Sequence, residues 1–304
     1  MRHCAPDRRR WLAASVWCGL GAAATLLPGC TQVSGLDYNG PDAPRALPLT
    51  RPVRTAWVFS AGGPRGFVHV GVLRALAQIG VAPDLIVGAS VGALVGALSA
   101  GGRSAADIEA LALDLQPWSM ARLAVGADER FSGDPLAELV RRELPRPWLE
   151  QLPVAMACAA VRQRDGALLG FTAGDAGVAV MASAAIEGQF APVRIQGELF
   201  VDPDRHAPLP VRLARALGAT RVLAVDASAH EDRAPPGAER YRAGDLRKRA
   251  LTAVDAAQAH LVLHPDFGYW VSLSREFRER AIDAGYRDTL AQADAIRRLH
   301  AGGA

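Results

Sequence analysis

Short apolar segments alternate with segments of helical periodicity through most of this 304-residue sequence. Strand character is found at 56–60, 85–87, 154–161, 199–201, 221–228 and 259–265, and helical character at 67–79, 91–100, 135–144, 180–186 and 211–217. Such alternation predicts an α/β fold in which helices sandwich a mostly parallel sheet. Residues 230–245 are polar and contain two prolines, so a surface loop is expected there, followed by two or three helices.

The first 29 residues have the layout of an export signal. Arg8, Arg9 and Arg10 precede an uncharged apolar run, 11–27, which leads into "LPGC". This motif resembles a lipoprotein lipobox, so Cys30 is predicted to be lipidated and to become the new N-terminus. A plain signal peptide and an uncleaved anchor are the alternatives, and the arginines do not decide between Sec and twin-arginine export.

Residues 30–54 are polar and interrupted by four prolines, which is typical of an extended tether. With Thr31 after the cysteine, the predicted location is the periplasmic face of the outer membrane of a bacterial envelope. The membrane is expected as a partner because of Cys30, and the net charge indicates no further partner. The signal holds four of the 34 basic and one of the 31 acidic residues, so the remainder carries 30 of each and gives no indication of nucleic-acid binding.

Cys158 is the one cysteine that remains after Cys30. A single thiol forms neither an intramolecular disulfide nor a zinc site, so it is interpreted as a small buried apolar residue.

The segment "SAGGPRGFVHVGVL" at 60–73 is a glycine-rich loop between a strand and a helix. A phosphate-binding loop of the NTPase type requires a lysine, and the only lysine is Lys248, far along the chain. A dinucleotide fingerprint would have Ala61 in place of its first glycine, and the acid Asp84 precedes the next strand instead of ending it. Nucleotide binding is therefore disfavoured.

The motif "GASVG" at 88–92 suggests a third interpretation of the glycine-rich loop, as part of a hydrolytic site. A G-x-S-x-G sequence between a strand and a helix is the context of a nucleophile elbow, in which Gly88 and Gly92 permit the sharp turn that exposes Ser90. Attack by a serine on an acyl carbon creates an oxyanion that needs hydrogen-bond donors. The backbone N–H groups of Gly62 and Gly63 are a sensible source because no side chain shields them.

Taken together, "AGGPRGFVHVGVL", "GASVG" and "ASAAIEGQFAPV" leading into "LFVDPDRHAPLPV" resemble the patatin-like phospholipases, especially the bacterial branch, over residues 55–286. The resemblance implies a three-layer α/β fold and hydrolysis of acyl esters without a catalytic histidine, metal or cofactor. Ser90 would be the nucleophile and Asp202 its proton acceptor. Gly62 and Gly63, with Arg65 behind them, would form the oxyanion hole, although Arg65 is equally explained as a surface residue paired with a carboxylate.

The sequence departs from the family pattern at three positions. Ala61 replaces a glycine, Glu187 occupies a position often held by proline, and the family's Asp-Gly or Asp-Ala is Asp202-Pro203. Proline lacks an N–H and restricts the residue before it to extended angles. Asp204 is therefore an alternative base, and a catalytically impaired lipoprotein that binds lipid or a partner is an alternative function.

Two other catalytic schemes are alternatives for this sequence. A Ser-His-Asp esterase could use one of His69, His206, His230, His260 and His264. His69 is more simply explained by packing. A Ser-Lys mechanism is disfavoured because Lys248 lies in the basic segment "LRKR", which is interpreted as surface.

The resulting prediction is one hydrolase domain at 55–300, with a core at 55–228 and a helical part at 238–300. It would act on lipid or another acyl ester as a phospholipase A, lysophospholipase or esterase. It would reach the membrane through Cys30 and bind neither nucleic acid nor nucleotide. Residues 118–131 could cover the acyl site as a lid, although an ordinary helix and loop is the favoured interpretation.

Overall fold

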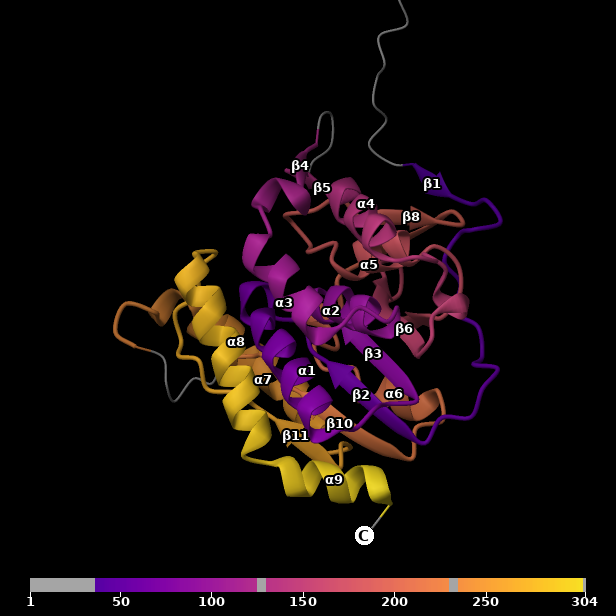
Figure 1. The fold of residues 1–304 in the computed structure, drawn as a ribbon. Helices are drawn as coiled ribbons and strands as arrows, with labels where there is room; N and C mark the ends of the chain where they lie inside the picture. The colour runs from indigo at the N-terminus through magenta and orange to yellow at the C-terminus, as the bar shows by residue number, and fades with distance from the viewer. Residues whose placement is uncertain (1–35, 125–129, 230–234, 303–304) are drawn as a thin grey trace, which may run out of the picture. The chain divides into compact units, whose positions relative to one another are not determined.

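A computed structural model describes residues 36–124, 130–229 and 235–302, in which nine strands form one sheet (Figure 1). The strand order is β1-β8-β9-β6-β3-β2-β10-β11, and β7 also pairs with β6. The parallel part contains β6 (Ala155–Arg162), β3 (Leu85–Ala89), β2 (Thr55–Phe59), β10 (Arg221–Val225) and β11 (Leu261–Leu263). The remaining strands are β1 (Asp37–Tyr38), β7 (Ala167–Phe171), β8 (Val193–Ile195) and β9 (Glu198–Val201). A separate hairpin joins β4 (Arg122–Leu123) to β5 (Phe131–Ser132).

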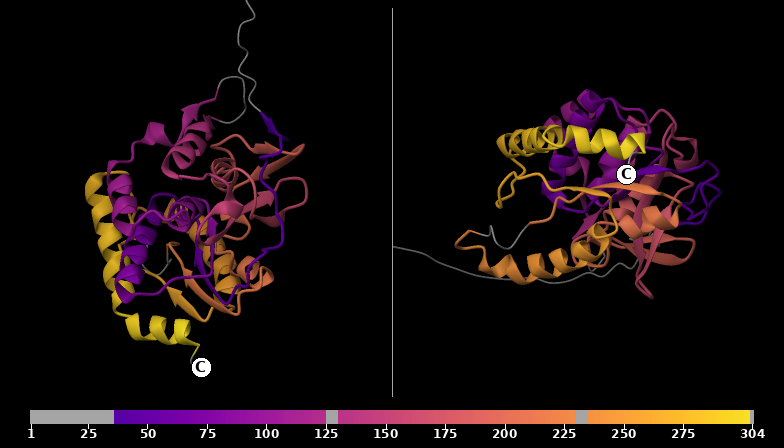
Figure 2. Two further views of the ribbon diagram at one scale, coloured as in Figure 1. Left: turned by 45° about the vertical axis from the view of Figure 1, so that its right-hand side comes forward. Right: turned by 90° about the horizontal axis from the view of Figure 1, so that it is seen from below.

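Helices cover both faces of this sheet. They are α1 (Phe67–Ile79), α2 (Val91–Ala100), α3 (Ala105–Asp114), α4 (Asp134–Glu143), α5 (Ala176–Ser183), α6 (Val211–Ala216), α7 (Glu239–Ala256), α8 (Arg275–Leu290) and α9 (Ala293–Ala301). Short 3₁₀ turns are η1 (Gly63–Gly66), η2 (Pro117–Ser119), η3 (Leu149–Gln151) and η4 (Pro203–Arg205). In the right-hand view of Figure 2 the yellow helices α8 and α9 lie on one side of the strands and the orange helix α7 on the other.

Alternating side chains along the central strands build the two apolar cores. In β2, Trp57 and Phe59 belong to the larger core beneath α1, α2 and α8, whereas Ala56 and Val58 face the smaller core beneath α6. All five residues of β2 are buried, which explains why the four residues after Thr55 are all apolar instead of alternating with polar residues. The predicted three-layer α/β sandwich is confirmed.

The helix boundaries differ from the predicted ones in three places. α3 was not predicted, α5 begins at Ala176 instead of residue 180, and α7 begins at Glu239, inside the expected 230–245 loop. Helix α7 buries only Thr252 and Asp255, so it carries no apolar stripe for a sequence pattern to reveal. Of the expected loop, residues 230–234 lie outside the described residues.

The described part of the predicted tether, residues 36–54, lies against the domain. β1 pairs with β8, the side chain of Ala43 is buried, and the backbone N–H of Arg45 donates to the carbonyl of Ala173 at 2.9 Å. The predicted signal and Cys30 lie outside the described residues. Within the described residues, no helix combines the length and apolar character needed to cross a membrane.

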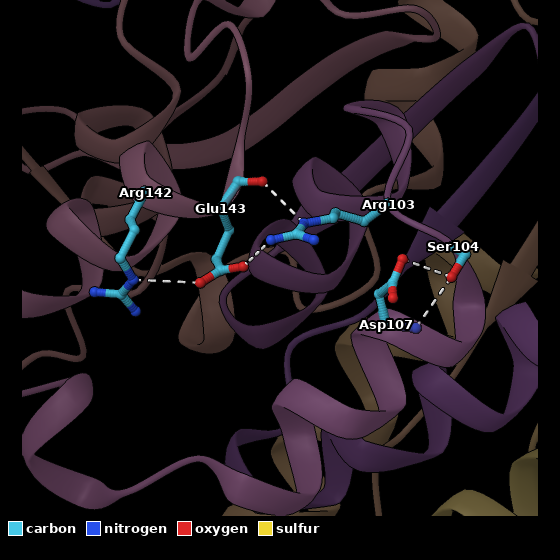
Figure 3. Close-up of polar contacts among 5 residues, drawn as sticks. All are labelled: Arg103, Ser104, Asp107, Arg142 and Glu143. Atoms are coloured by element: carbon cyan, nitrogen blue, oxygen red, sulfur yellow. Dashed lines mark hydrogen bonds and ion pairs between the residues drawn. The ribbon is translucent and has the colours of Figure 1, made fainter.

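Polar contacts lie at the ends of α2, α3 and α4 (Figure 3). These three helices line an apolar cavity. After α2, the Nε of Arg103 donates to the carbonyl of Glu143 at 3.0 Å, and its guanidinium also pairs with the Glu143 carboxylate at the end of α4. The next residue, Ser104, caps α3 by accepting the backbone N–H of Asp107 at 3.1 Å. The Arg103–Glu143 contacts thus tie the connection between α2 and α3 to the end of α4, and the Ser104 cap stabilises the start of α3.

Candidate active site

The register of β6 brings Ser90 and Asp202 to one point. β7 covers one side of β6, so β3 and β9 must share the other side, since a strand residue has one neighbour on each side. β3 ends with Ala89 opposite Ala159, and β9 runs the other way and ends with Val201 opposite Val161. The residues that follow these two strands, Ser90 and Asp202, therefore meet beside the single intervening residue of β6.

Ser90 stands on a strained turn. Its φ of 55° and ψ of −123° lie in a region that non-glycine residues rarely adopt. The flanking glycines are required by close backbone contacts: a Cβ on Gly88 would lie 2.3 Å from the carbonyl oxygen of Gly92, and one on Gly92 would lie 2.4 Å from that of Phe59. This is the geometry of a nucleophile elbow.

Two contacts hold the serine in place. Its backbone N–H donates to the hydroxyl oxygen of Ser183 in α5 at 2.9 Å, and both residues are buried. Ser90 is also the N-cap of α2, so the positive end of that helix dipole lies at the serine and favours a negative charge there. Sequence reasoning did not identify Ser183.

The glycine loop after β2 presents unused backbone donors. Gly63 has a φ of +52° and opens η1, and it lines the same cavity as Ser90. Within the described part of the chain, the N–H groups of Gly62 and Gly63 donate to no acceptor. Free, preorganised N–H groups near a nucleophile are what an oxyanion hole requires.

Asp202 is buried, with 2 % of its surface exposed. It is the N-cap of η4, and its Oδ1 accepts the backbone N–H of Asp204 at 2.8 Å. Pro203 occupies the first position of this turn, where a missing N–H costs nothing, and the ψ of 133° at Asp202 is that expected before a proline. Pro203 is therefore compatible with a carboxylate aimed at the serine.

The second oxygen of that carboxylate, Oδ2, is buried and has no hydrogen-bond partner within the described residues. The Ser90 side chain is near enough to lower the pKa of Asp202, although the two do not meet the ordinary distance and angle limits of a hydrogen bond. Burial is the larger influence and raises the pKa of Asp202 to about 7. A base with a pKa near neutrality is well matched to proton transfer at neutral pH.

Arg65 turns away from this cavity. Its guanidinium donates to the carbonyl of Tyr269 at 2.9 Å and lies over the Tyr269 ring, 5.4 Å from the ring centroid. Its side chain lines a second, smaller cavity of about 30 Å³. Burial lowers the pKa of Arg65. Arg65 therefore lies behind the glycine loop, and its guanidinium points to the segment before α8.

The histidines are engaged elsewhere. His69 is fully buried in α1, with Nε2 at 2.9 Å from the carbonyl of Ser60, and burial lowers its pKa to about 4. His260 contacts the backbone N–H of Val222 through Nδ1 at 3.1 Å. Among the described residues, none of the hydrogen bonds of Ser90 or Asp202 involves a histidine. His230 lies outside the described residues.

An apolar cavity of about 300 Å³ begins at the nucleophile. Besides Ser90 and the η1 loop, its lining is almost wholly apolar and comes mainly from α1, α2, α3 and α4. Pro117 also lines it, as do Met120 and Ala121 from the lid candidate at 118–131. The lining also includes Leu273, just before α8. Its volume is at the lower end of the range for ligand sites, and its lining suits a hydrocarbon chain.

The fold and this site define an α/β protein with a serine nucleophile elbow and an adjacent buried carboxylate. The sequence profile of the family described as "Patatin-like phospholipase" matches residues 57–215, just over half of the chain, from β2 to α6. The chain belongs to the patatin-like phospholipase family. The family predicted from the sequence is therefore confirmed.

Individual relatives match parts of the chain. An "Uncharacterized NTE family protein" of Mycobacterium bovis is 30 % identical over 181 residues, which cover 59 % of this chain and 50 % of that protein. Human "Patatin-like phospholipase domain-containing protein 6" is 30 % identical over 195 residues, covering 58 % of this chain and 14 % of that protein. The chain thus spans half or less of these relatives. The solved structure of VipD from Legionella pneumophila matches with a TM-score of 0.49 and 14 % identity, covering 86 % of this chain and 71 % of that one.

Proposed function

We propose that this protein is a serine acyl-ester hydrolase that uses Ser90 and Asp202 as a dyad and acts on lipids. One observation carries the proposal: a strained serine and a buried carboxylate with an unpartnered oxygen meet at the head of an apolar cavity. Backbone strain and a buried carboxylate both cost free energy, and such features concentrate at functional sites.

The dyad accounts for both halves of the reaction. Ser90 Oγ forms a bond to the ester carbonyl carbon while its proton passes to Asp202, and the oxyanion is held by the N–H groups of Gly62 and Gly63. The alkoxide then leaves with the proton from Asp202. Water attacks the acyl-serine, gives a proton to Asp202 and releases the fatty acid, and Ser90 recovers its proton from Asp202.

The cavity supports a long acyl chain as the bound part of the substrate. Nearly all of its lining is apolar and lies on the side of Ser90 formed by α2, α3 and α4. An acyl chain placed there would put its carbonyl at Ser90 and leave the alcohol portion outside. Phospholipid, lysophospholipid and simpler esters all satisfy this arrangement.

Labelling by a fluorophosphonate probe tests the proposal directly. A fluorophosphonate reacts with an activated serine, so stoichiometric labelling is expected, with the adduct on the peptide that contains Ser90. Heat-denatured protein is the control and should remain unlabelled because activation depends on the folded dyad. Repeated failure to label the folded protein would contradict the proposal and favour the catalytically impaired, lipid-binding alternative.

Action at a membrane surface is part of the proposal. Trp118 and Trp270, 71 % and 49 % exposed, lie on the two segments that supply Pro117, Met120 and Leu273 to the cavity lining. Exposed tryptophans beside an acyl-chain cavity fit a bilayer interface. A lipidated Cys30 would tether the domain to the envelope, which cell fractionation and mass spectrometry of the N-terminal peptide can test.

Replacing both tryptophans with alanine should weaken binding to phosphatidylethanolamine–phosphatidylglycerol vesicles by at least about tenfold, since each buries apolar surface in the bilayer. Hydrolysis of a soluble short-chain ester should stay unchanged. A Cys30→Ser background removes any lipid anchor that would mask the effect. Leu246→Ala combined with Val254→Ala, which alters exposed residues of α7, is the matched control. Equal losses in the two double variants would contradict a docking role for the tryptophans.

A further inference from the structure

Helix α7 carries Lys248, the only lysine of the chain, and its side chain is 17 % exposed. Leu246 and Arg247 of the same basic segment are exposed, as interpreted from the sequence, but the Lys248 side chain is mostly covered and its ammonium forms an ion pair with the Asp204 carboxylate. Covering a lysine costs side-chain freedom and solvation, and among the described residues the Asp204 carboxylate is the acidic group that pairs with it.

The contact of Lys248 leads directly to the candidate base. Asp204 binds Lys248 through its side chain and donates its backbone N–H to Oδ1 of Asp202 at 2.8 Å. That donation occupies one carboxylate oxygen and leaves Oδ2 unpartnered at the serine. η4 is only three residues long, so it has little internal structure of its own to hold Asp204. Lys248 supplies an external support.

The same face of α7 also reaches the glycine loop. Asp245, three residues before Lys248 and so on the same side of the helix, accepts a hydrogen bond from the Tyr269 hydroxyl at 2.7 Å. Tyr269 in turn accepts from Arg65 through its carbonyl and lies beneath the Arg65 guanidinium. Helix α7 is therefore linked to Asp202 through Asp204, and to Arg65 of the glycine loop through Tyr269. The family match ends at residue 215, before this helix begins.

We propose that Lys248 is a positioning residue of the dyad, which holds Asp204 and through it keeps the Asp202 carboxylate ionised and oriented toward Ser90. The inference rests on the proposed function. It does not make Lys248 a catalytic base, since its ammonium contacts Asp204 and not the serine.

Removal of the Lys248 charge is expected to raise the pKa of Asp202. The groups that act on the Asp202 carboxyl are Ser90 from the elbow, Asp204 from η4 and Lys248 from α7. The negative charge of Asp204 raises the pKa of Asp202, whereas the positive charge of Lys248 lowers it. Removing the lysine also leaves Asp204 without its counter-charge, so both changes favour the protonated, inactive form of Asp202.

The pH dependence of kcat/KM for a soluble nitrophenyl ester, measured on the full chain at the isosbestic wavelength of nitrophenol, tests this inference. In Lys248→Met the acidic limb should move up by about one pH unit, with about fivefold lower kcat/KM at pH 7 and recovery toward the wild-type value at pH 9. Lys248→Arg should restore the wild-type limb. Asp204→Asn should move the limb down, because it removes a negative charge but keeps the backbone donor.

Opposite shifts from two neighbouring variants separate positioning from simple structural damage, which lowers activity at every pH. Arg247→Met, an exposed residue of the same helix, is the matched control and should leave the limb in place. An unchanged limb in Lys248→Met, or shifts in the same direction in both variants, would overturn the inference. Failure of the proposed function is distinguishable because the wild-type protein would then neither hydrolyse the ester nor react with a fluorophosphonate.

Discussion

Alanine at position 90 is expected to reduce ester hydrolysis to the uncatalysed background, a loss of at least about 10⁴-fold, and to abolish fluorophosphonate labelling. Removing the hydroxyl leaves no atom to form the acyl intermediate. The fold should survive, because the elbow is held by the backbone N–H of Ser90 and by the glycines on either side, none of which the substitution removes. The free energy of unfolding should change by no more than about 1 kcal/mol.

Ser183→Ala is the matched control for this prediction. It removes a second buried serine hydroxyl beside the first and leaves the buried N–H of Ser90 without an acceptor. This variant should lose about 1–3 kcal/mol of stability and retain measurable hydrolysis, because the nucleophile is present but less well held. The two variants thus separate catalysis from stability. Full activity in Ser90→Ala, or complete inactivity in a folded Ser183→Ala, would contradict the roles assigned to the two serines.

The parallel core was predictable from sequence because its strands are buried on both faces. Strands such as β2 and β10 therefore read as continuous apolar runs that stop at turn-forming residues. Ser90 was predictable for a related reason. The turn that exposes it tolerates only glycine at Gly88 and Gly92, and this steric requirement leaves a short local pattern.

Residues that act across long sequence separations left no such pattern. Ser183 is one hydroxyl in an alanine-rich helix, and its contact with Ser90 spans 93 positions. Lys248 meets Asp204 across 44 positions from a helix with almost no apolar stripe. In both cases the side chain is ordinary for its local segment, so only the packing of the elements reveals its partner.

Pro203 shows the opposite error, in which a local rule was applied without its context. A proline after the aspartate removes an N–H, and the sequence suggested that this would harm the site. In the structure the missing N–H falls at the first position of η4, and the donor to Asp202 comes from Asp204. The 3₁₀ turn η4 therefore accommodates Pro203, the residue that departs from the family pattern.

Asp202→Asn is expected to abolish hydrolysis and at the same time to stabilise the protein at alkaline pH. Asparagine has nearly the same shape and keeps an oxygen for the backbone N–H of Asp204, but it cannot accept the serine proton, so kcat should fall by about 10²–10⁴-fold. Burial raises the pKa of Asp202 to about 7 in the folded protein, against about 3.9 in an unfolded chain.

The sign of the stability effect follows from proton binding. Between about pH 4 and pH 7 the folded state holds a proton on Asp202 that the unfolded state has lost, so the free energy of unfolding falls as pH rises through this range. Above pH 7 the fall in the free energy of unfolding is complete and amounts to roughly 2–4 kcal/mol. The asparagine variant has no carboxyl group at position 202, so its free energy of unfolding does not fall in this way. Denaturant unfolding of both proteins should therefore agree near pH 4 and diverge by pH 8, with the variant more stable; parallel curves would mean that Asp202 is not held as a buried carboxylate. A carboxylate that is buried for catalysis lowers the stability of the protein, so its replacement should raise stability while it removes activity.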